Sequence, residues 1–207
     1  MKRKVIAFTI ALMIVSTSAY AYNQDIPSDW ATEYITKANE LDLIPHQLNT
    51  DYTQAITRAE FCALAVKLYE TITEEPIQER MQFVDSTDIN VEKMGALGIV
   101  NGVGGNRFNP DGTLTREQAA TIMARLAEEL NIDLKWESPT TFIDVDTISR
   151  WAFDAVGQMR GSGIMGGIGN NTFSPHGTYT REQSITTILR LHDAIQEALN
   201  PIPSCCR

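Results

Sequence analysis

The stretch FNPDGTLTREQAATIMARLA, residues Phe108 to Ala127, joins a turn, a helix start and an amphipathic helix. Thr115 and Gln118 match the capping box, in which the threonine hydroxyl and the residue three positions later satisfy backbone N–H groups reciprocally. The apolar residues that follow have helical spacing: Ala119, Ile122, Met123 and Leu126. The stretch therefore predicts a helix with one buried face.

The stretch is one copy of an internal repeat. Thr-Arg occurs at residues 57–58, 115–116 and 180–181, and the last two copies match closely, with GIVNGVGGNRFNPDGTLTREQ beside GIMGGIGNNTFSPHGTYTREQ. The first copy, LIPHQLNTDYTQAITRAEF, keeps Thr57 and Glu60 of the capping box but lacks the Phe, the Pro-x-Gly turn and the glycines. Self-similarity at this spacing indicates three repeated supersecondary units.

Each copy also has an aspartate that leads into a short upstream helix. The three segments are DIPSDWATEYITKANEL from Asp25, DSTDINVEKMGALG from Asp85 and DVDTISRWAFDAVGQMRGSG from Asp144. Gly98 and Gly163, each followed by isoleucine, predict left-handed helix ends with an apolar contact just beyond them. Asp42 occupies the matching place in the first copy.

The downstream helices differ in their apolar faces. The first copy has Phe61, Leu64, Ala65 and Leu68 at the same offsets from its threonine as the second copy. The third copy has Ser184, Thr187, Ile188 and Leu191 there, with Ile185 and Leu189 alongside. We therefore expect its buried face to be rotated or less completely buried. The predicted fold class is all-α, mainly helical with short loops.

The first residues have the order of a secretory signal peptide. Lys2, Arg3 and Lys4 precede an apolar run, residues 5–15, and the small-residue site Ala19-Tyr20-Ala21. This run is shorter than the ~20 residues that a membrane-spanning helix needs, and no later segment predicts a span. Removing residues 1–21 changes the net charge from -9 to -12, because three cations leave. That charge argues against nucleic acid or an anionic membrane as a partner.

The cysteines and the motif content argue against a disulfide framework, a metal site and an enzyme. Cys62 lies in an apolar helical pattern and is predicted to be a core residue, whereas Cys205 and Cys206 either pair with another chain or belong to a frayed tail. The register of an EF-hand fails, because Arg107 and Gln118 stand where calcium needs carboxylates. No catalytic motif is present, so we expect neither catalysis nor a cofactor.

The arginines of the Thr-Arg pairs are unexplained by capping. Arg58, Arg116 and Arg181 each stand at the first helical position, where a cation faces the positive end of the helix dipole at a cost of ~0.3–1 kcal/mol. Two interpretations remain open. The arginines bind an anionic ligand, or they form structural salt bridges to Asp25, Asp85 or Asp144.

The combination of a helix, a glycine-bounded loop, F-x-P-[DH]-G-T, T-R-[AE]-[EQ] and a second helix resembles the S-layer homology (SLH) repeat. The resemblance implies three repeats, at residues 22–75, 81–134 and 140–199, with a tail at 200–207. It implies a pseudo-threefold arrangement around a central three-helix bundle. Grooves between the repeats would bind secondary cell-wall polysaccharide, in many members with a pyruvylated amino sugar at its end. The family is non-catalytic and anchors proteins to the surface of Gram-positive and related bacteria.

The resemblance also implies roles for the repeated residues. Arg58, Arg116 and Arg181 would each bind the pyruvate carboxylate through two parallel hydrogen bonds, assisted by the helix N-terminus. The glycine loops, which include Gly102 and Gly167, would form the rim of each groove. The three aspartates orient the arginines or accept sugar hydroxyls, unless they are ordinary turn or cap residues.

Two tryptophans and the divergence of the repeats complete this prediction. Trp30 and Trp151 either stack on a sugar or pack in the core, and core packing is the preferred prediction because apolar helix faces usually bury tryptophan. The first repeat lacks the glycine loop and the second lacks the tryptophan, so we do not expect three equivalent grooves.

Alternative functions remain open. The chain is a stand-alone wall-binding component, a truncated anchor of a larger surface enzyme or adhesin, or a structural protein that self-assembles or binds a surface-layer partner. For self-assembly, Cys205 and Cys206 would be the handle.

Overall fold

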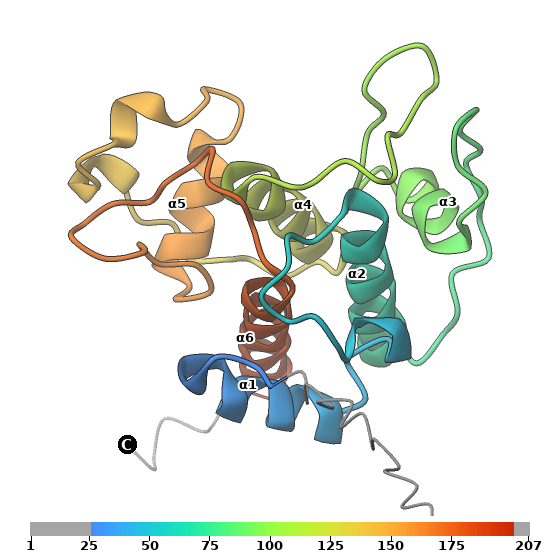
Figure 1. Cartoon of the computed structure of the whole chain (residues 1–207), viewed down its shortest axis with the longest axis horizontal. Helices are drawn as coiled ribbons and strands as arrows, with labels where there is room; N and C mark the ends of the chain where they lie inside the picture. The colour runs from blue at the N-terminus through green and yellow to red at the C-terminus, as the bar shows by residue number, and fades with distance from the viewer. Residues whose placement is uncertain (1–25, 201–207) are drawn as a thin grey trace, which may run out of the picture.

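The computed structural model describes residues 26–200 (Figure 1). The predicted signal peptide, Asp25, Cys205 and Cys206 lie outside these residues. Within residues 26–200 the chain forms six α-helices, and β-bridges occur there only as isolated pairs. The predicted all-α fold class is confirmed.

The helices alternate between short and long along the chain. In order they are α1 (Asp29–Glu40), α2 (Arg58–Thr73), α3 (Ile89–Ala96), α4 (Arg116–Glu129), α5 (Phe153–Gly161) and α6 (Arg181–Leu199). Three 3-10 turns lie in the connections: η1 (His46–Leu48), η2 (Pro139–Thr141) and η3 (Val145–Thr147).

The helix starts and ends agree with the sequence patterns. Each of α2, α4 and α6 begins with a complete capping box, at Thr57, Thr115 and Thr180. Gly98 and Gly163 have φ angles of 71° and 68°, and the N–H of the isoleucine after each donates to the helix, Ile99 to Met94 O at 3.1 Å and Ile164 to Met159 O at 2.9 Å. These left-handed ends are confirmed, and Asp42 has the same conformation, with φ 52°.

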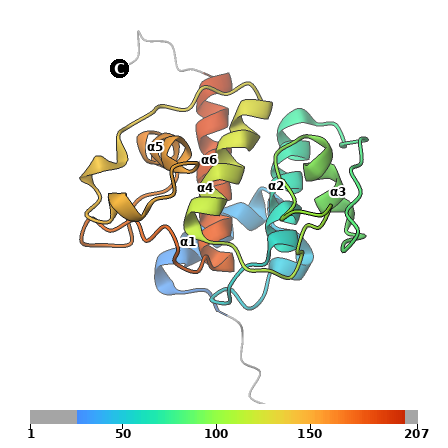
Figure 2. The ribbon, with the colours of Figure 1, turned by 90° about the horizontal axis from the view of Figure 1, so that it is seen from above.

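The long helices α2, α4 and α6 contact one another and form the centre of the fold (Figures 1 and 2). Their shared apolar offsets are buried, as predicted: Phe61, Leu64, Ala65 and Leu68 on α2, and Ala119, Ile122, Met123 and Leu126 on α4. Cys62 is also buried, which confirms it as a core residue.

The expectation of a rotated or less buried face on α6 is wrong. Ser184 and Thr187 are as buried as the apolar residues that they replace, and Ile185 and Leu189 are buried as well. The hydroxyls donate to carbonyls of their own helix, Ser184 to Thr180 O at 2.8 Å and Thr187 to Gln183 O at 3.0 Å. Hydroxyl groups that donate to carbonyls of their own helix can be buried. Helix α6 needs a wide buried surface because it contacts α1, α2 and α4.

The short helices pack in a cyclic order. Helix α3 packs on α2, α5 packs on α4, and α1 packs on α6 (Figure 1). The first helix of each repeat thus lies against the second helix of the preceding repeat, and α1 closes the circle. A pseudo-threefold arrangement and the predicted repeat boundaries require such an order but stay predictions.

Backbone hydrogen bonds close a second circle at the helix starts. Ile56 N donates to Tyr179 O at 2.9 Å, Tyr179 N to Leu114 O at 3.2 Å, and Leu114 N to Ile56 O at 3.2 Å. Each of these buried residues directly precedes a capping threonine. The ring holds the starts of α2, α4 and α6 together, and so sets where the three arginines lie.

Candidate functional site

The main candidate site is a groove on α6, called here the α6 groove. It has a volume of about 390 Å³ and lies between α6, the start of α4, the loop after α5 and α1. The residues that matter for its chemistry are Trp30, Arg116, Gly166, Thr186, Thr187 and Arg190.

A second groove on α4, called here the α4 groove, is its counterpart one repeat earlier. It has a volume of about 170 Å³. Its lining residues occupy the same repeat positions, in the same order: Trp151, Arg58, Asn101, Thr121, Ile122 and Arg125. The α6 and α4 grooves therefore lie at equivalent positions in the repeats, and each brings together one tryptophan and two arginines.

The Thr-Arg arginines of the two grooves make the same contacts. Arg58 Nε donates to Phe108 O at 2.9 Å and its Nη2 to Asn101 O at 3.0 Å. Arg116 Nε donates to Phe173 O and its Nη2 to Gly166 O, both at 2.8 Å. Each guanidinium also lies over a phenylalanine ring, Arg58 over Phe108 at 4.4 Å. Each arginine thus ties its helix start to two segments of the next repeat.

Burial affects the ionisation of both arginines. Arg116 is only 7% exposed, and desolvation lowers the pKa of its guanidinium from the ordinary value. Desolvation also lowers the pKa of Arg58. Arginine remains cationic at neutral pH despite such shifts, so both grooves carry a partly desolvated positive charge, a setting that strengthens attraction to an anion.

The expected help from helix N-termini is not available. In α4, Arg116 N donates to Gly177 O at 3.2 Å, Glu117 N to Pro175 O at 3.0 Å, and Gln118 N to the Thr115 hydroxyl at 3.4 Å. The first turns of α2 and α6 are satisfied in the same way by the neighbouring repeat. The helix N-termini therefore cannot assist the anion through these N–H groups, because carbonyls of the neighbouring repeat and the hydroxyl of the capping threonine already accept their hydrogen bonds.

Arg181 lies in a different environment, called here the third interface, where the start of α6 meets α2 and the loop between α1 and α2; α3 packs on α2 beside it. Its Nη2 is 2.5 Å from Glu60 Oε1, and its Nη1 is 3.4 Å from Asp51 Oδ2. Lys67, the counterpart of Arg125 and Arg190, pairs with Asp42 at 2.5 Å. The cations of the third interface are therefore neutralised by carboxylates of the chain.

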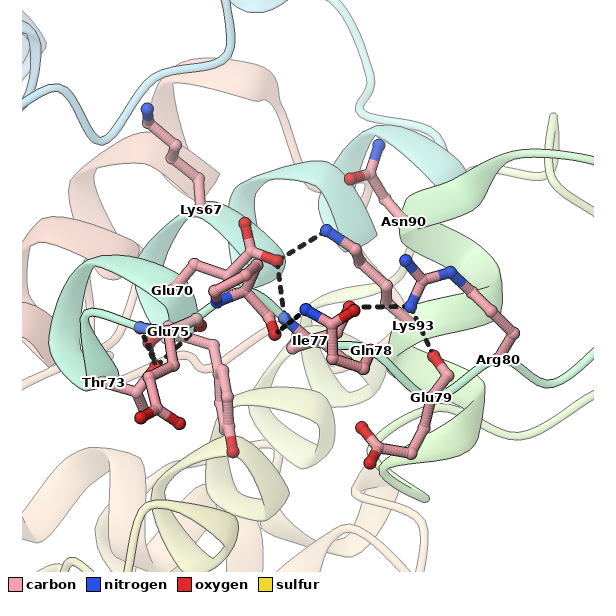
Figure 3. Close-up of polar contacts among 12 residues, drawn as sticks. Lys67, Glu70, Thr73, Glu75, Ile77, Gln78, Glu79, Arg80, Asn90 and Lys93 are labelled. Atoms are coloured by element: carbon pink, nitrogen blue, oxygen red, sulfur yellow. Dashed lines mark hydrogen bonds and ion pairs between the residues drawn. The ribbon is translucent and has the colours of Figure 1, made fainter.

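The α2–α3 contact also lacks the tryptophan. Asn90 follows the N-cap of α3 by two residues, as Trp30 follows that of α1, and Figure 3 shows Asn90 on α3 near the Glu70–Lys93 ion pair. Glu70 Oε1 lies 2.5 Å from Lys93 Nζ and accepts the N–H of Ile77 at 3.0 Å. This cluster fastens α3, and the linker between α2 and α3, to α2.

The tryptophans correct the sequence-based prediction. Trp30 is 49% exposed and Trp151 is 57% exposed, and each lines a groove. Core packing is therefore wrong for both, although the alanines directly after them are fully buried. In α1 the buried face includes Ala31, and Trp30 lies beside it. Trp151 lies in the turn just before α5, whose N-cap is the buried Ala152.

The aspartates hold turns. Asp85 accepts the N–H groups of Phe108 at 2.7 Å and Asn109 at 2.9 Å, and Asp144 accepts those of Phe173 at 2.9 Å and Ser174 at 2.7 Å. The hydrogen bond from Phe108 N is the largest of the effects that lower the pKa of Asp85. Among the described residues, Asp85 and Asp144 form no ion pair with the Thr-Arg arginines, so the salt-bridge alternative does not hold for them.

The predicted glycines allow a close backbone approach. An added Cβ would lie 2.6 Å from Arg107 O at Gly102 and 2.8 Å from Thr172 O at Gly167. Gly167 lines the α6 groove, whereas Gly102 supports the loop beside the α4 groove without lining it. Both positions need glycine for the loop to fold.

Several groove residues were missed by the sequence reasoning. Arg125 and Arg190 stand nine residues after Arg116 and Arg181, and Lys67 stands nine after Arg58. That recurring cation was a usable signal. Buried Glu182 accepts both the N–H of Ser28 at 3.0 Å and its hydroxyl at 2.9 Å, and Glu117 holds Ser149 in the same way.

Residues 26–200 show no group of histidine, cysteine or acidic side chains that could hold a metal ion. In the same part of the chain, no helix has the length and apolarity to cross a bilayer. Cys62 is buried, and desolvation raises the pKa of its thiol.

Comparisons with known proteins give the family. Residues 85–120 and 141–183 match the family model of the S-layer homology domain. The chain is similar to an amylopullulanase of Thermoanaerobacterium thermosulfurigenes, 32% identical over 184 residues, or 84% of this chain and 10% of the relative. Exoglucanase XynX of Acetivibrio thermocellus is 32% identical over 174 residues, which are 81% of this chain and 16% of the relative.

A surface layer protein of Brevibacillus choshinensis is 33% identical over 101 residues, which are 48% of this chain and 9% of the relative. The chain therefore spans 9% to 16% of the length of these three relatives. S-layer homology domains are non-catalytic modules that anchor proteins at the cell surface, and this places the chain there. On these matches, the chain belongs to the proteins with S-layer homology domains.

Proposed function

We propose that this chain anchors a protein non-covalently to the bacterial wall by binding secondary cell-wall polysaccharide in the α6 and α4 grooves. The observation that carries the proposal is the recurrence of one side-chain set in two hollows: an exposed tryptophan with two arginines. Aromatic faces stack on sugar rings, and guanidinium groups bind carboxylates. The chain itself has no catalytic role in this proposal.

The arginines retain donors for an anionic sugar. Two of the five N–H donors of Arg116 point to protein carbonyls, the one on Nε and one of the two on Nη2. Three donors remain, two on Nη1 and one on Nη2. A pyruvate ketal carries the carboxylate that these donors would bind. Arg190, which donates to Tyr34 at 3.0 Å, adds a second cation to the same groove. At the third interface Arg181 already binds carboxylates, so we propose two working grooves and not three.

The test is co-sedimentation of residues 22–207 with purified cell-wall sacculi of the source bacterium. Sacculi are used intact, after removal of the polysaccharide, and after removal of pyruvate alone. We expect binding to be lost in both treatments. The double variant Trp30→Ala/Trp151→Ala should lose it as well, by at least about tenfold in apparent affinity. Trp136→Ala is the matched control, since Trp136 is 52% exposed and lines neither groove.

Binding to stripped sacculi would contradict the proposal and favour the alternative of self-assembly or a surface-layer partner. Under that alternative the protein forms oligomers without any wall material. Replacement of Cys205 and Cys206 by serine then tests the C-terminal cysteines as the link.

A further inference from the structure

The two grooves differ in capacity at one loop position. The α6 groove has about 390 Å³ and the α4 groove about 170 Å³. Gly166 lines the larger groove, and Asn101 occupies the same repeat position in the smaller one. A Cβ built at Gly166 meets no atom within 4 Å, so the missing side chain leaves open space. The carbonyl of each residue still accepts the groove arginine.

The grooves also differ in the chemistry of their inner walls. Thr187 and Tyr179 form a buried hydroxyl pair, 2.5 Å apart, on the side of the α6 groove. The residues at the same repeat positions in the α4 groove region are apolar, Ile122 and Leu114. The inner wall of the α6 groove is therefore polar where its counterpart is apolar.

One hydroxyl of the α6 groove has no partner. Thr186 lines the groove and is 2% exposed, and its Oγ1 is buried without a hydrogen bond. The matching Thr121 donates to Glu117 O at 2.9 Å. A buried hydroxyl that lacks a partner destabilises the fold, and such groups are rare. This exception is explained if a ligand supplies the partner after a rotation of the side chain.

We infer that the α6 groove is the tighter of two saccharide sites, and that Gly166 and Thr186 determine its specificity for a sugar with a bulky polar substituent. Gly166 leaves room for the substituent, and the Thr186 hydroxyl hydrogen-bonds to it. The inference rests on the proposed function, because both grooves must bind saccharide for their affinities to be compared.

The experiment is calorimetric titration of residues 22–207 with the methyl glycoside of a 4,6-pyruvylated N-acetylhexosamine. Trp30→Ala leaves only the α4 groove, and Trp151→Ala leaves only the α6 groove. We expect the Trp151→Ala protein to bind about tenfold more tightly than the Trp30→Ala protein, a ratio that one well-placed hydrogen bond to a ligand can supply.

Further substitutions test the two residues within those backgrounds. In Trp151→Ala protein, Gly166→Asn and Thr186→Val should each weaken binding about fivefold or more. Thr186→Val should leave the thermal midpoint unchanged or higher, because it removes an unpaired buried hydroxyl; a merely structural role would lower it. In Trp30→Ala protein, Asn101→Gly should raise the affinity. Thr71→Val is the control and should leave the affinity unchanged, because Thr71 is exposed and lines neither groove.

Equal affinities of the two single-groove proteins would overturn the inference and leave the proposed function standing. Unchanged affinity in Thr186→Val would show that Thr186 does not contribute to the specificity of the α6 groove. If the unsubstituted protein does not bind the glycoside, the proposed function fails for this ligand class and the inference fails with it.

Discussion

The α6 groove and the third interface contain the same sequence motif, but its arginine has opposite surroundings in the two places. Both have an arginine at the first position of a capped helix, aimed at the neighbouring repeat. Arg116 meets neutral carbonyls and lies in a hollow beside Trp30, whereas Arg181 meets the carboxylates of Glu60 and Asp51. An arginine is available to an anionic ligand only where the fold offers it no carboxylate.

A single position accounts for much of this difference. The capping-box residue is glutamine in the two grooves, Gln183 and Gln118, and glutamate at the third interface, Glu60. Glu60 uses one oxygen to cap Thr57 N at 2.9 Å and the other to bind Arg181. Glutamine satisfies the cap equally well and adds no charge. The choice between two residues that are equivalent for capping thus decides whether the neighbouring cation is neutralised.

The largest effect on stability is expected for Arg116→Ala compared with Arg181→Ala. Arg116→Ala leaves two carbonyls without their charged donor, and should lower the free energy of unfolding by about 3 kcal/mol. Arg181→Ala removes ion pairs whose partners are partly exposed, and should cost about 1 kcal/mol. Urea denaturation measures both values. Equal losses would show that the two arginines stabilise the fold alike and would break the comparison.

A smaller effect is expected at the buried glutamate of the α6 groove. Glu182→Ala should cost about 2 kcal/mol, because it removes both hydrogen bonds to Ser28, the N-cap of α1. The third interface has Ala59 at this position, and there Asp88 caps α3 with its own carboxylate. Adding Ser28→Asp to Glu182→Ala should therefore recover about 1 kcal/mol. Thermal unfolding of the three proteins tests this, and a double variant no more stable than Glu182→Ala would contradict it.

The smallest effect is expected from Asp85, whose turn carries the Phe108 carbonyl that Arg58 binds. Backbone N–H groups, that of Phe108 foremost, hold the pKa of Asp85 below its ordinary value. A lowered folded-state pKa means that the stabilisation is present above the unfolded-state value, about pH 4, and is lost as the pH falls through the folded-state value.

Asp85→Asn should reduce the loss of stability at acid pH. The difference in thermal midpoint between the unsubstituted protein and Asp85→Asn should therefore shrink as the pH falls below about 4. Midpoints measured at neutral pH and at several acidic values follow the trend. A constant difference across the series would show that the ionisation of Asp85 does not contribute.

Local elements were predictable from the sequence because short-range rules fix them. The capping boxes at Thr57, Thr115 and Thr180, the left-handed ends at Gly98 and Gly163 and the apolar faces of α2 and α4 all depend on residues a few positions apart. Predictions failed where a contact between repeats decides the outcome. Helix α6 is buried widely because three other helices contact it, and no periodicity within its own sequence shows that.

The sequence by itself determined three helix pairs, their starts and ends, and the family of the chain, because those features are written in adjacent residues. Only the tertiary structure decided which arginines lie in open grooves, that carbonyls of the next repeat already satisfy the helix N-termini, and that Trp30 and Trp151 stay exposed. The physical reason is that each site is built between repeats. The partner of a cation lies up to 156 positions away in the chain, as Tyr34 does from Arg190.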